Sequence, residues 1–245
     1  MSVTYQSALN DLRARLDEKG VARFWADAQL ISWIAQGCRD VARRSETLWE
    51  YNTGIAAVPS EAEYALPGDV LRLHRIEYVP QASLNPVTVY PLMLSNKYEM
   101  DQRWGAAQYL QSIYPTWAVI RGTPGNPRNN GSSNLIFQVY PVPSQAGVFR
   151  VDYFALPNGN PATTDNLEVS GGYEDLPLLW AEAIALRSDR DPRWQESRQL
   201  YEQDLAAMID MTRQLHDQSR QMVYSGVGGS GYAGAYGYDS IWGGL

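Results

Sequence analysis

Helical periodicity occurs at both ends of this chain and is missing from its middle, and this arrangement constrains the fold more than any other feature. Apolar residues recur every three or four positions at 5–16 and 25–46, and again at 173–189 and 191–223. Between these segments lie short β-branched and aromatic runs, punctuated by proline and glycine. The terminal helices therefore have only each other on which to bury their apolar faces.

Local signals mark where the helices begin and end. Gly20 stops the first helix, and Asp27 lies in the first turn of the second, where its charge complements the helix dipole. Asp191 is expected to cap the last helix, with Pro192 in its first turn. A further short helix is expected within 95–112. The last helix can run for about 30 residues, or roughly 45 Å.

The middle of the chain predicts strands that pair antiparallel. No helix-length crossover separates most of the apolar runs, and parallel pairing requires such a crossover. In one run the alternating residues Phe149, Val151, Tyr153 and Ala155 share a face, as expected of a half-buried strand. The polar stretch 122–134 predicts a long loop between two strands.

These patterns predict an α+β protein: a four-helix bundle with an inserted antiparallel β-rich module and a flexible C-terminal extension. A chain of 245 residues is long enough to bury a real core. The expected segments are N-terminal bundle helices at 1–47, the inserted β-rich module at 48–169, C-terminal bundle helices at 170–223 and a Gly/Tyr-rich docking tail at 224–245.

The end of the chain has an unusual composition. From Ser225 to Leu245 it contains eight glycines in 21 residues and a single charge, Asp239. Such a segment is expected to be disordered when free, because glycine loses the most backbone entropy on ordering. It nevertheless carries large side chains that a pure spacer lacks. These candidate anchors are Tyr232, Tyr236, Tyr238, Ile241 and Trp242. The composition indicates a flexible arm that docks on a partner; a terminus without a role is the alternative.

Charge and cysteine content exclude several classes of protein. The net charge of −7 disfavours electrostatic binding of nucleic acid, which needs clustered Lys and Arg. A single cysteine, Cys38, excludes an internal disulfide framework and is compatible with a reducing cytoplasm. The N-terminal stretch has no apolar signal-peptide region, and no run of 18 apolar residues predicts a membrane span. We therefore expect no membrane contact.

Candidate catalytic residues are scarce. His74 and His216 lie 142 positions apart, in a predicted strand and a predicted helix, and neither has metal-ligand spacing with the other or with Cys38. Cys38 falls on the apolar face of its helix, where a thiol usually acts as a small hydrophobe. No nucleophile elbow, phosphate-binding loop or dinucleotide fingerprint opening a helix after a strand is present. The glycine run GVGGSG at 226–231 follows a predicted helix and does not lead into another. The sequence predicts no enzyme, no cofactor and no metal. Trp33 lies beside the apolar stripe, at the core edge or on a contact surface.

Four stretches resemble one protein family in their order along the chain and in their short residue motifs. They read FWADAQLISWIAQGCRDVARRSETLW, EYALPGDVLRLHRIEY, NLIFQVYPVPSQAGVFRVDYFALP and YEDLPLLWAEAIALRSDRDP. The shared motifs are LP-x-D before one predicted strand, YP-x-P before another, and Y-x-x-x-P at the end of that second strand. In these features the chain, from about Ala22 to Arg193, resembles the head-to-tail adaptor, or connector, proteins of tailed bacteriophages.

The resemblance implies a structural protein of the virion. Such adaptors form a homo-oligomeric ring, often a dodecamer, that docks on the portal protein ring and extends the DNA channel used in genome ejection. The ring also provides the attachment surface for a tail or nozzle protein. The resemblance further implies a helical bundle with an inserted β-module, assembly in the host cytoplasm, and a C-terminal extension that reaches the portal. An acidic channel wall suits DNA that passes without specific binding.

Two other functional readings remain open from the sequence. One is another ring of the phage tail or nozzle, or a head-completion component, which shares the structural class. The other is a glycan-binding module or an enzyme built on the aromatic middle of the chain. Its candidate stacking residues are Trp104, Tyr109, Tyr114 and Trp117.

Overall fold

The computed structural model describes residues 3–18, 24–80, 88–104, 110–122, 135–169 and 171–225. The chain divides into two compact units, Met1–Ile209 and Asp210–Leu245. The first unit holds all of the strands and all but the C-terminal part of the last helix. The predicted polar loop, apart from its first residue, lies outside the described residues.

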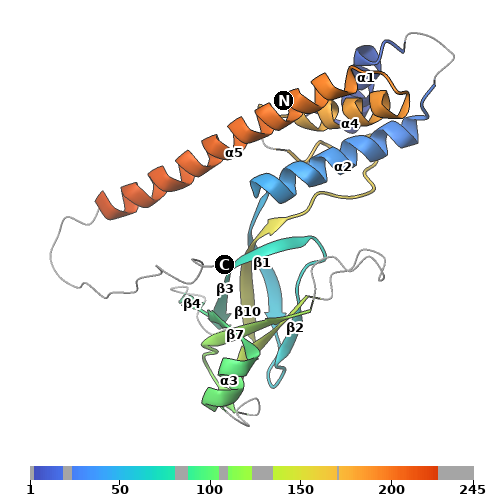
Figure 1. The fold of residues 1–245 in the computed structure, drawn as a ribbon. Helices are drawn as coiled ribbons and strands as arrows, with labels where there is room; N and C mark the ends of the chain where they lie inside the picture. The colour runs from blue at the N-terminus through green and yellow to red at the C-terminus, as the bar shows by residue number, and fades with distance from the viewer. Residues whose placement is uncertain are drawn as a thin grey trace. The chain divides into compact units, whose positions relative to one another are not determined.

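The four helices expected near the ends of the chain are all present (Figure 1). They are α1 (Tyr5–Arg15), α2 (Asp27–Ser45), α4 (Asp175–Ser188) and α5 (Trp194–Ser225). The Thr4 hydroxyl caps α1 by accepting a hydrogen bond from the Ser7 backbone N–H at 3.2 Å. At the other end of α2, Glu46 adopts the left-handed conformation that ends the helix.

One apolar core joins α1, α2 and α4. The predicted stripe of α2 is buried there, including Leu30, Ile34 and Cys38. From α1 the core takes Tyr5, Leu9 and Leu12, and from α4 it takes Leu178 and Ala181. The segment after the last strand closes this core, because the Leu167 backbone N–H donates to the Val3 carbonyl at 2.8 Å. The prediction that the terminal helices bury their apolar faces on one another is confirmed.

The predicted four-helix bundle is wrong, although the α+β class is consistent with the structure. Within the first unit, α5 contributes only its N-terminal turns to a core, through Tyr201, Leu205 and Met208 against α2 and α4. Unequal length explains this: at 1.5 Å per residue, the 11 residues of α1 span roughly 16 Å and the 32 of α5 roughly 48 Å. A fifth helix, α3 (Lys97–Trp104), lies among the strands.

Within the described ranges, the strands form two four-stranded sheets and a two-stranded one. The first has the order β1-β10-β3-β4 and is antiparallel throughout. Its strands are β1 (Trp49–Ala57), β10 (Gly147–Ala155), β3 (Val70–Pro80) and β4 (Tyr90–Pro91). The second has the order β2-β8-β7-β5. Its strands are β2 (Glu63–Ala65), β8 (Ile136–Tyr140), β7 (Trp117–Arg121) and β5 (Met93–Ser95).

The prediction that the strands pair antiparallel is wrong for two of the described strand pairs. β5 pairs with β7 in parallel, and so do β6 (Gln111–Ser112) and β9 (Val142–Pro143). The physical reason is the short helix that the sequence did predict. α3 lies between β5 and β7 in the chain and forms part of the crossover that parallel strands need.

The two larger sheets share one core. The alternating residues Phe149, Val151, Tyr153 and Ala155 are all buried in it, as predicted. Phe149 lies at its centre, with ring centroids 4.8 Å from Tyr64 and 5.2 Å from Phe137. The strands therefore enclose an apolar core of their own, separate from the helical core. Met100 of α3 belongs to a further small cluster with Val119 and Tyr140.

Candidate functional site

The predicted tail anchors, Tyr232 through Trp242, lie outside the described residues, so their docking role stays a prediction. The remaining candidates occupy ordinary structural positions. His74 is exposed on β3 and meets the Trp49 ring edge-on at 4.8 Å, which confirms its place on a strand surface. Trp33 is half-buried and packs edge-on against Trp25 at 5.2 Å, within the chain. The His216 side chain is not among those described.

Cys38 is a buried thiol in the helical core. The Tyr5 hydroxyl donates a hydrogen bond to its Sγ at 3.5 Å. Burial raises the pKa of Cys38 to about 11, so the thiol stays protonated at neutral pH. This environment supports the prediction that Cys38 acts as a small hydrophobe.

Neither a metal centre nor a membrane segment is found in the described parts of the chain. Over those residues, no three His, Cys, Asp or Glu side chains gather closely enough to hold a metal ion. No helix in the same ranges combines the length and apolar character needed to cross a bilayer.

The alternative glycan-stacking set is only partly described. Tyr114 is exposed and packs at a tilt against Tyr90, with ring centroids 4.3 Å apart. Trp117 is half-buried and packs against the small cluster of Met100, Val119 and Tyr140. The side chains of Trp104 and Tyr109 are not described. Of the two members whose side chains are described, only Tyr114 is exposed, so the glycan-stacking set stays untested as a whole.

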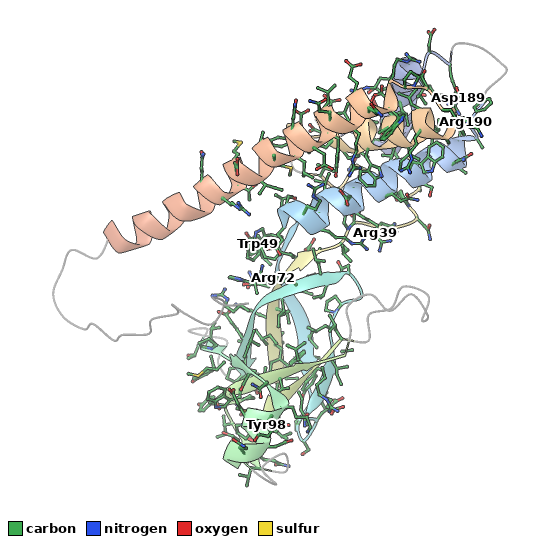
Figure 2. All side chains as sticks on the ribbon, viewed as in Figure 1. Arg39, Trp49, Arg72, Tyr98, Asp189 and Arg190 are labelled. Atoms are coloured by element: carbon green, nitrogen blue, oxygen red, sulfur yellow. The ribbon has the colours of Figure 1, made fainter. Side chains whose placement is uncertain are left out.

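Six exposed apolar side chains lie on α3 and on the segments that flank it in the sequence, and we call this set the α3 surface. Its members fall within 22 positions of the sequence: Met93, Leu94, Tyr98, Leu110, Ile113 and Tyr114. Tyr98, labelled in Figure 2, is the most exposed of them at 71%. Monomeric proteins rarely gather apolar groups on the surface, and such patches mark interaction sites.

Local structure explains why these side chains face solvent. The sequence of α3, KYEMDQRW, is mostly polar and buries Met100. Asn96 caps the helix by accepting from the Glu99 backbone N–H at 2.8 Å, and the Ser95 hydroxyl donates to the Glu99 carboxylate at 2.6 Å. Because α3 is short and mostly polar, it has no further apolar residues that could cover Tyr98. The polar composition of α3 is the sequence signal that could have revealed the α3 surface.

A second feature is a pocket of about 1150 Å³ at the junction of α2 with β1 and β10, which we call the junction pocket. Figure 2 labels Arg39 on α2 and Trp49 at the start of β1. The lining comprises Arg39, Arg43, Leu48, Trp49, Glu50, Gly68, Asp69, Ala155, Leu156, Pro157, Asn158, Gly159, Asn160 and Glu168. The LPGD and YFALP motifs thus meet here, a convergence in space that the sequence alone did not reveal.

Two carboxylates of the junction pocket accept hydrogen bonds from other residues of its wall. The Tyr153 hydroxyl donates to both Asp69 oxygens, at 3.2 and 3.3 Å. Burial, with the Asp69 charge as the next cause, raises the pKa of Tyr153 to about 12. The Glu168 carboxylate accepts from the Asn158 backbone N–H at 2.9 Å. These contacts hold the pocket wall in place.

The described residues form an α+β protein with exposed apolar side chains on and beside α3. The family comparison agrees: residues 3–229 match the SU10 adaptor protein family, and the chain belongs to that family. No curated protein matches the chain. The resemblance to phage head-to-tail adaptors is thereby confirmed, and with it a structural adaptor role in a bacteriophage particle. This role suggests a non-enzymatic function and a place in the virion.

Proposed function

We propose that this chain is the head-to-tail adaptor of its phage: copies form a ring, the ring docks on the portal and extends the DNA channel, and its outer surface attaches the tail. Family membership over residues 3–229 is the observation that carries this proposal. The ring, its dodecameric count and the two docking partners belong to the proposal.

The α3 surface is suited to the attachment of a tail or nozzle protein. Apolar and aromatic side chains such as Tyr98 and Tyr114 are the residue types that anchor protein interfaces. Charged groups lie beside them, with Lys97 Nζ 3.6 Å from Asp101 Oδ1. An apolar centre with a charged rim is the usual build of an interface.

The C-terminal stretch Ser225–Leu245 supplies the contact with the portal in this proposal. Fully extended, its 21 residues can reach about 70 Å. Its glycines allow it to follow an irregular surface, and its aromatic side chains provide the anchors. Ordering on contact offsets part of the interaction free energy, which is typical of segments that fold on binding.

The acidic composition fits a channel through which DNA moves. A net charge of −7 per copy is multiplied by the number of copies in the ring. A wall with negative charge repels phosphate and lets the duplex slide, whereas a basic wall would retain it.

The test is co-sedimentation with the portal protein encoded by the same genome. The full chain is compared with a chain that ends after Tyr224. We expect the full chain to join the portal as a symmetric ring and the shortened chain to remain free. If both join, the tail is not the tether but the adaptor function stands. If neither joins, the head-to-tail adaptor function is overturned in favour of a ring elsewhere in the tail, which the same assay with purified tail proteins would detect.

A further inference from the structure

The loop that follows β10 carries an Asn-Gly pair, Asn158 and Gly159, in the lining of the junction pocket. This dipeptide is chemically reactive, because the backbone nitrogen of the second residue can attack the side-chain amide of the first. Glycine favours the attack, since it has no Cβ atom to block the approach. Asn158 is exposed, and the loop around it belongs to no helix or strand. The reaction therefore has access to water at this position.

The local geometry bends the Asn158 side chain toward the peptide that follows it. Its Oδ1 atom accepts a hydrogen bond from the Asn160 backbone N–H at 3.0 Å, which forms an Asx turn. The hydrogen bond also draws electron density from the side-chain carbonyl carbon, which is the atom attacked. The Asn158 N–H donates to the Glu168 carboxylate at 2.9 Å, and this contact holds the residue in place. Reactants held in this way lose less entropy on the path to the transition state.

The attacking nitrogen is available, and a cation lies beside it. No described residue accepts a hydrogen bond from the Gly159 N–H. A Cβ atom on Gly159 would lie 2.9 Å from Arg39 Nη1 and 3.4 Å from Arg39 Cζ, so the guanidinium packs against this glycine. A nearby positive charge favours the deprotonated nitrogen, which is the form that attacks. Arg39 also makes a glycine suitable here, because a side chain at position 159 would have to displace the guanidinium.

We propose that Asn158 deamidates without an enzyme and that Arg39 promotes the reaction. The Gly159 nitrogen loses its proton to water and forms a bond to Asn158 Cγ. The bond between Cγ and Nδ2 breaks, ammonia leaves with a proton returned by water, and a five-membered cyclic imide remains. Water then opens either carbonyl of the imide, so residue 158 becomes aspartate or isoaspartate. The steps consume water and release ammonia, with no change of oxidation state.

The two products affect the junction pocket differently. Aspartate keeps an oxygen that can accept from the Asn160 N–H, so the turn persists while a negative charge is added beside Arg39. Isoaspartate carries the main chain through the side-chain carbon atoms, which lengthens the backbone and moves Gly159 relative to Arg39. The proposal thus goes beyond the adaptor function: it identifies the junction pocket as a place where charge and loop geometry change as the protein ages.

Mass spectrometry of the full-length chain tests the reaction. The folded protein is kept for several weeks in mildly alkaline buffer and digested, and each asparagine is read for the mass gain of deamidation. Two neighbouring residues are internal controls. Asn160 precedes Pro161, which has no N–H, and Asn166 precedes a bulky leucine that hinders the attack. We expect Asn158 to convert at least roughly tenfold faster than Asn166. Isoaspartyl methyltransferase with labelled S-adenosylmethionine should mark the isoaspartate product.

A chain unfolded in guanidinium chloride and incubated in parallel shows whether the folded loop permits the reaction. Conversion of Asn158 in the unfolded chain but not in the folded one would mean that the loop protects it, and the proposal would be overturned. No conversion in either sample, or equal conversion of Asn158 and Asn166 in the folded chain, overturns it as well.

The role of Arg39 is tested by removing its charge. Arg39→Gln should slow conversion of Asn158 several-fold, whereas Arg39→Lys, which keeps a cation, should restore most of the rate. The matched control is Arg43→Gln, since Arg43 lies one turn along α2 and lines the same pocket. That variant should react like the unaltered chain. Equal rates for Arg39→Gln and Arg43→Gln, both folded by far-ultraviolet circular dichroism, overturn the role of Arg39.

Discussion

The helical region, comprising α1, α2, α4 and α5 as far as Ile209, has ion pairs between its helices and few exposed apolar side chains, such as Leu200. The strands and α3 also have ion pairs, such as Arg121 with Glu63, but they expose more apolar side chains. In the helical region Arg44 binds Glu202, Arg198 binds Glu202, and Arg15 binds Asp175, at 2.6 to 2.7 Å. Around α3, Met93, Leu94 and Tyr98 face solvent instead.

This difference suggests that the helical region makes most of its contacts within the chain, whereas the α3 surface is available for contacts with a partner. The pairs Arg44–Glu202 and Arg15–Asp175 join different helices, so they help to hold the helical region together. A region that exposes apolar groups has contact area left for a partner. The difference suggests that changes in the helical region alter stability, while changes around α3 alter assembly. Substitutions in each region test whether stability and assembly are divided in this way.

The largest effect is expected in the core between the two sheets. Phe149 is fully buried and contacts Tyr64, Tyr78 and Phe137. Phe149→Ala leaves a cavity and should lower the free energy of unfolding by about 3–5 kcal/mol. The measurement is urea denaturation followed by tryptophan fluorescence. Val148→Ala is the matched control, since that neighbour is 41% exposed on the same strand and should change stability by less than about 0.5 kcal/mol. Equal effects would mean that this core does not hold the sheets together.

The next effect tests whether ion pairs stabilise the helical region. The buried Arg13 guanidinium pairs with Glu18 and Asp27 and donates to the Trp25 carbonyl at 3.0 Å. Arg13→Met leaves the Glu18 carboxylate, whose side chain is only 10% exposed, without its cation. We expect a loss of about 3 kcal/mol in thermal or urea unfolding.

Arg15→Met on the same helix is the control for Arg13. Its hydrogen-bonded partner Asp175 has a side chain that is 74% exposed, so water screens that pair, and its second partner, Glu182, lies farther away at 3.9 Å. The expected loss is below about 1 kcal/mol. If the two variants lose the same free energy of unfolding, burial does not explain the contribution of the Arg13 ion pairs.

The same two regions differ in how far the sequence predicted them. Helical spacing identified α1, α2, α4 and α5, because each helix buries a continuous stripe and its signal is local. The sequence did not reveal the parallel pairing of β5 with β7. The relative direction of these strands depends on the path of the chain through α3, and the residues of the strands themselves do not encode it. The α3 surface was missed for a related reason: an apolar residue in a short run reads as core until the structure shows that nothing covers it.

A smaller effect concerns acid stability. Hydrogen bonding to Arg44, aided by Arg198, lowers the pKa of Glu202 below its ordinary value of 4.5. A lowered folded-state pKa stabilises the protein above pH 4.5, and that stabilisation is lost as the pH falls through the folded value. Because both side chains are about 40% exposed, the contribution is at most about 1 kcal/mol.

The Glu202 contribution is measured by urea denaturation between pH 7 and pH 3. Glu202→Gln should be less stable than the unaltered chain at pH 7, and the two curves should converge below pH 4.5. Curves that stay parallel across this range would show that Glu202 is not the titrating group.

The smallest effect on stability, and the sharpest test of the division, is expected at Tyr98. Tyr98→Ser removes an exposed ring that contributes little to the core, so the free energy of unfolding should change by less than about 0.5 kcal/mol. Loss of an interface aromatic should nevertheless reduce binding of the tail or nozzle protein at least tenfold, measured by co-sedimentation. Gln102→Ser, on the same helix and also exposed, should bind normally. If Tyr98→Ser binds normally too, the exposed apolar groups around α3 serve no tail contact. A destabilised Tyr98→Ser would instead place that ring in the core, and the proposed division between a stabilising helical region and a partner-binding β-region would no longer hold.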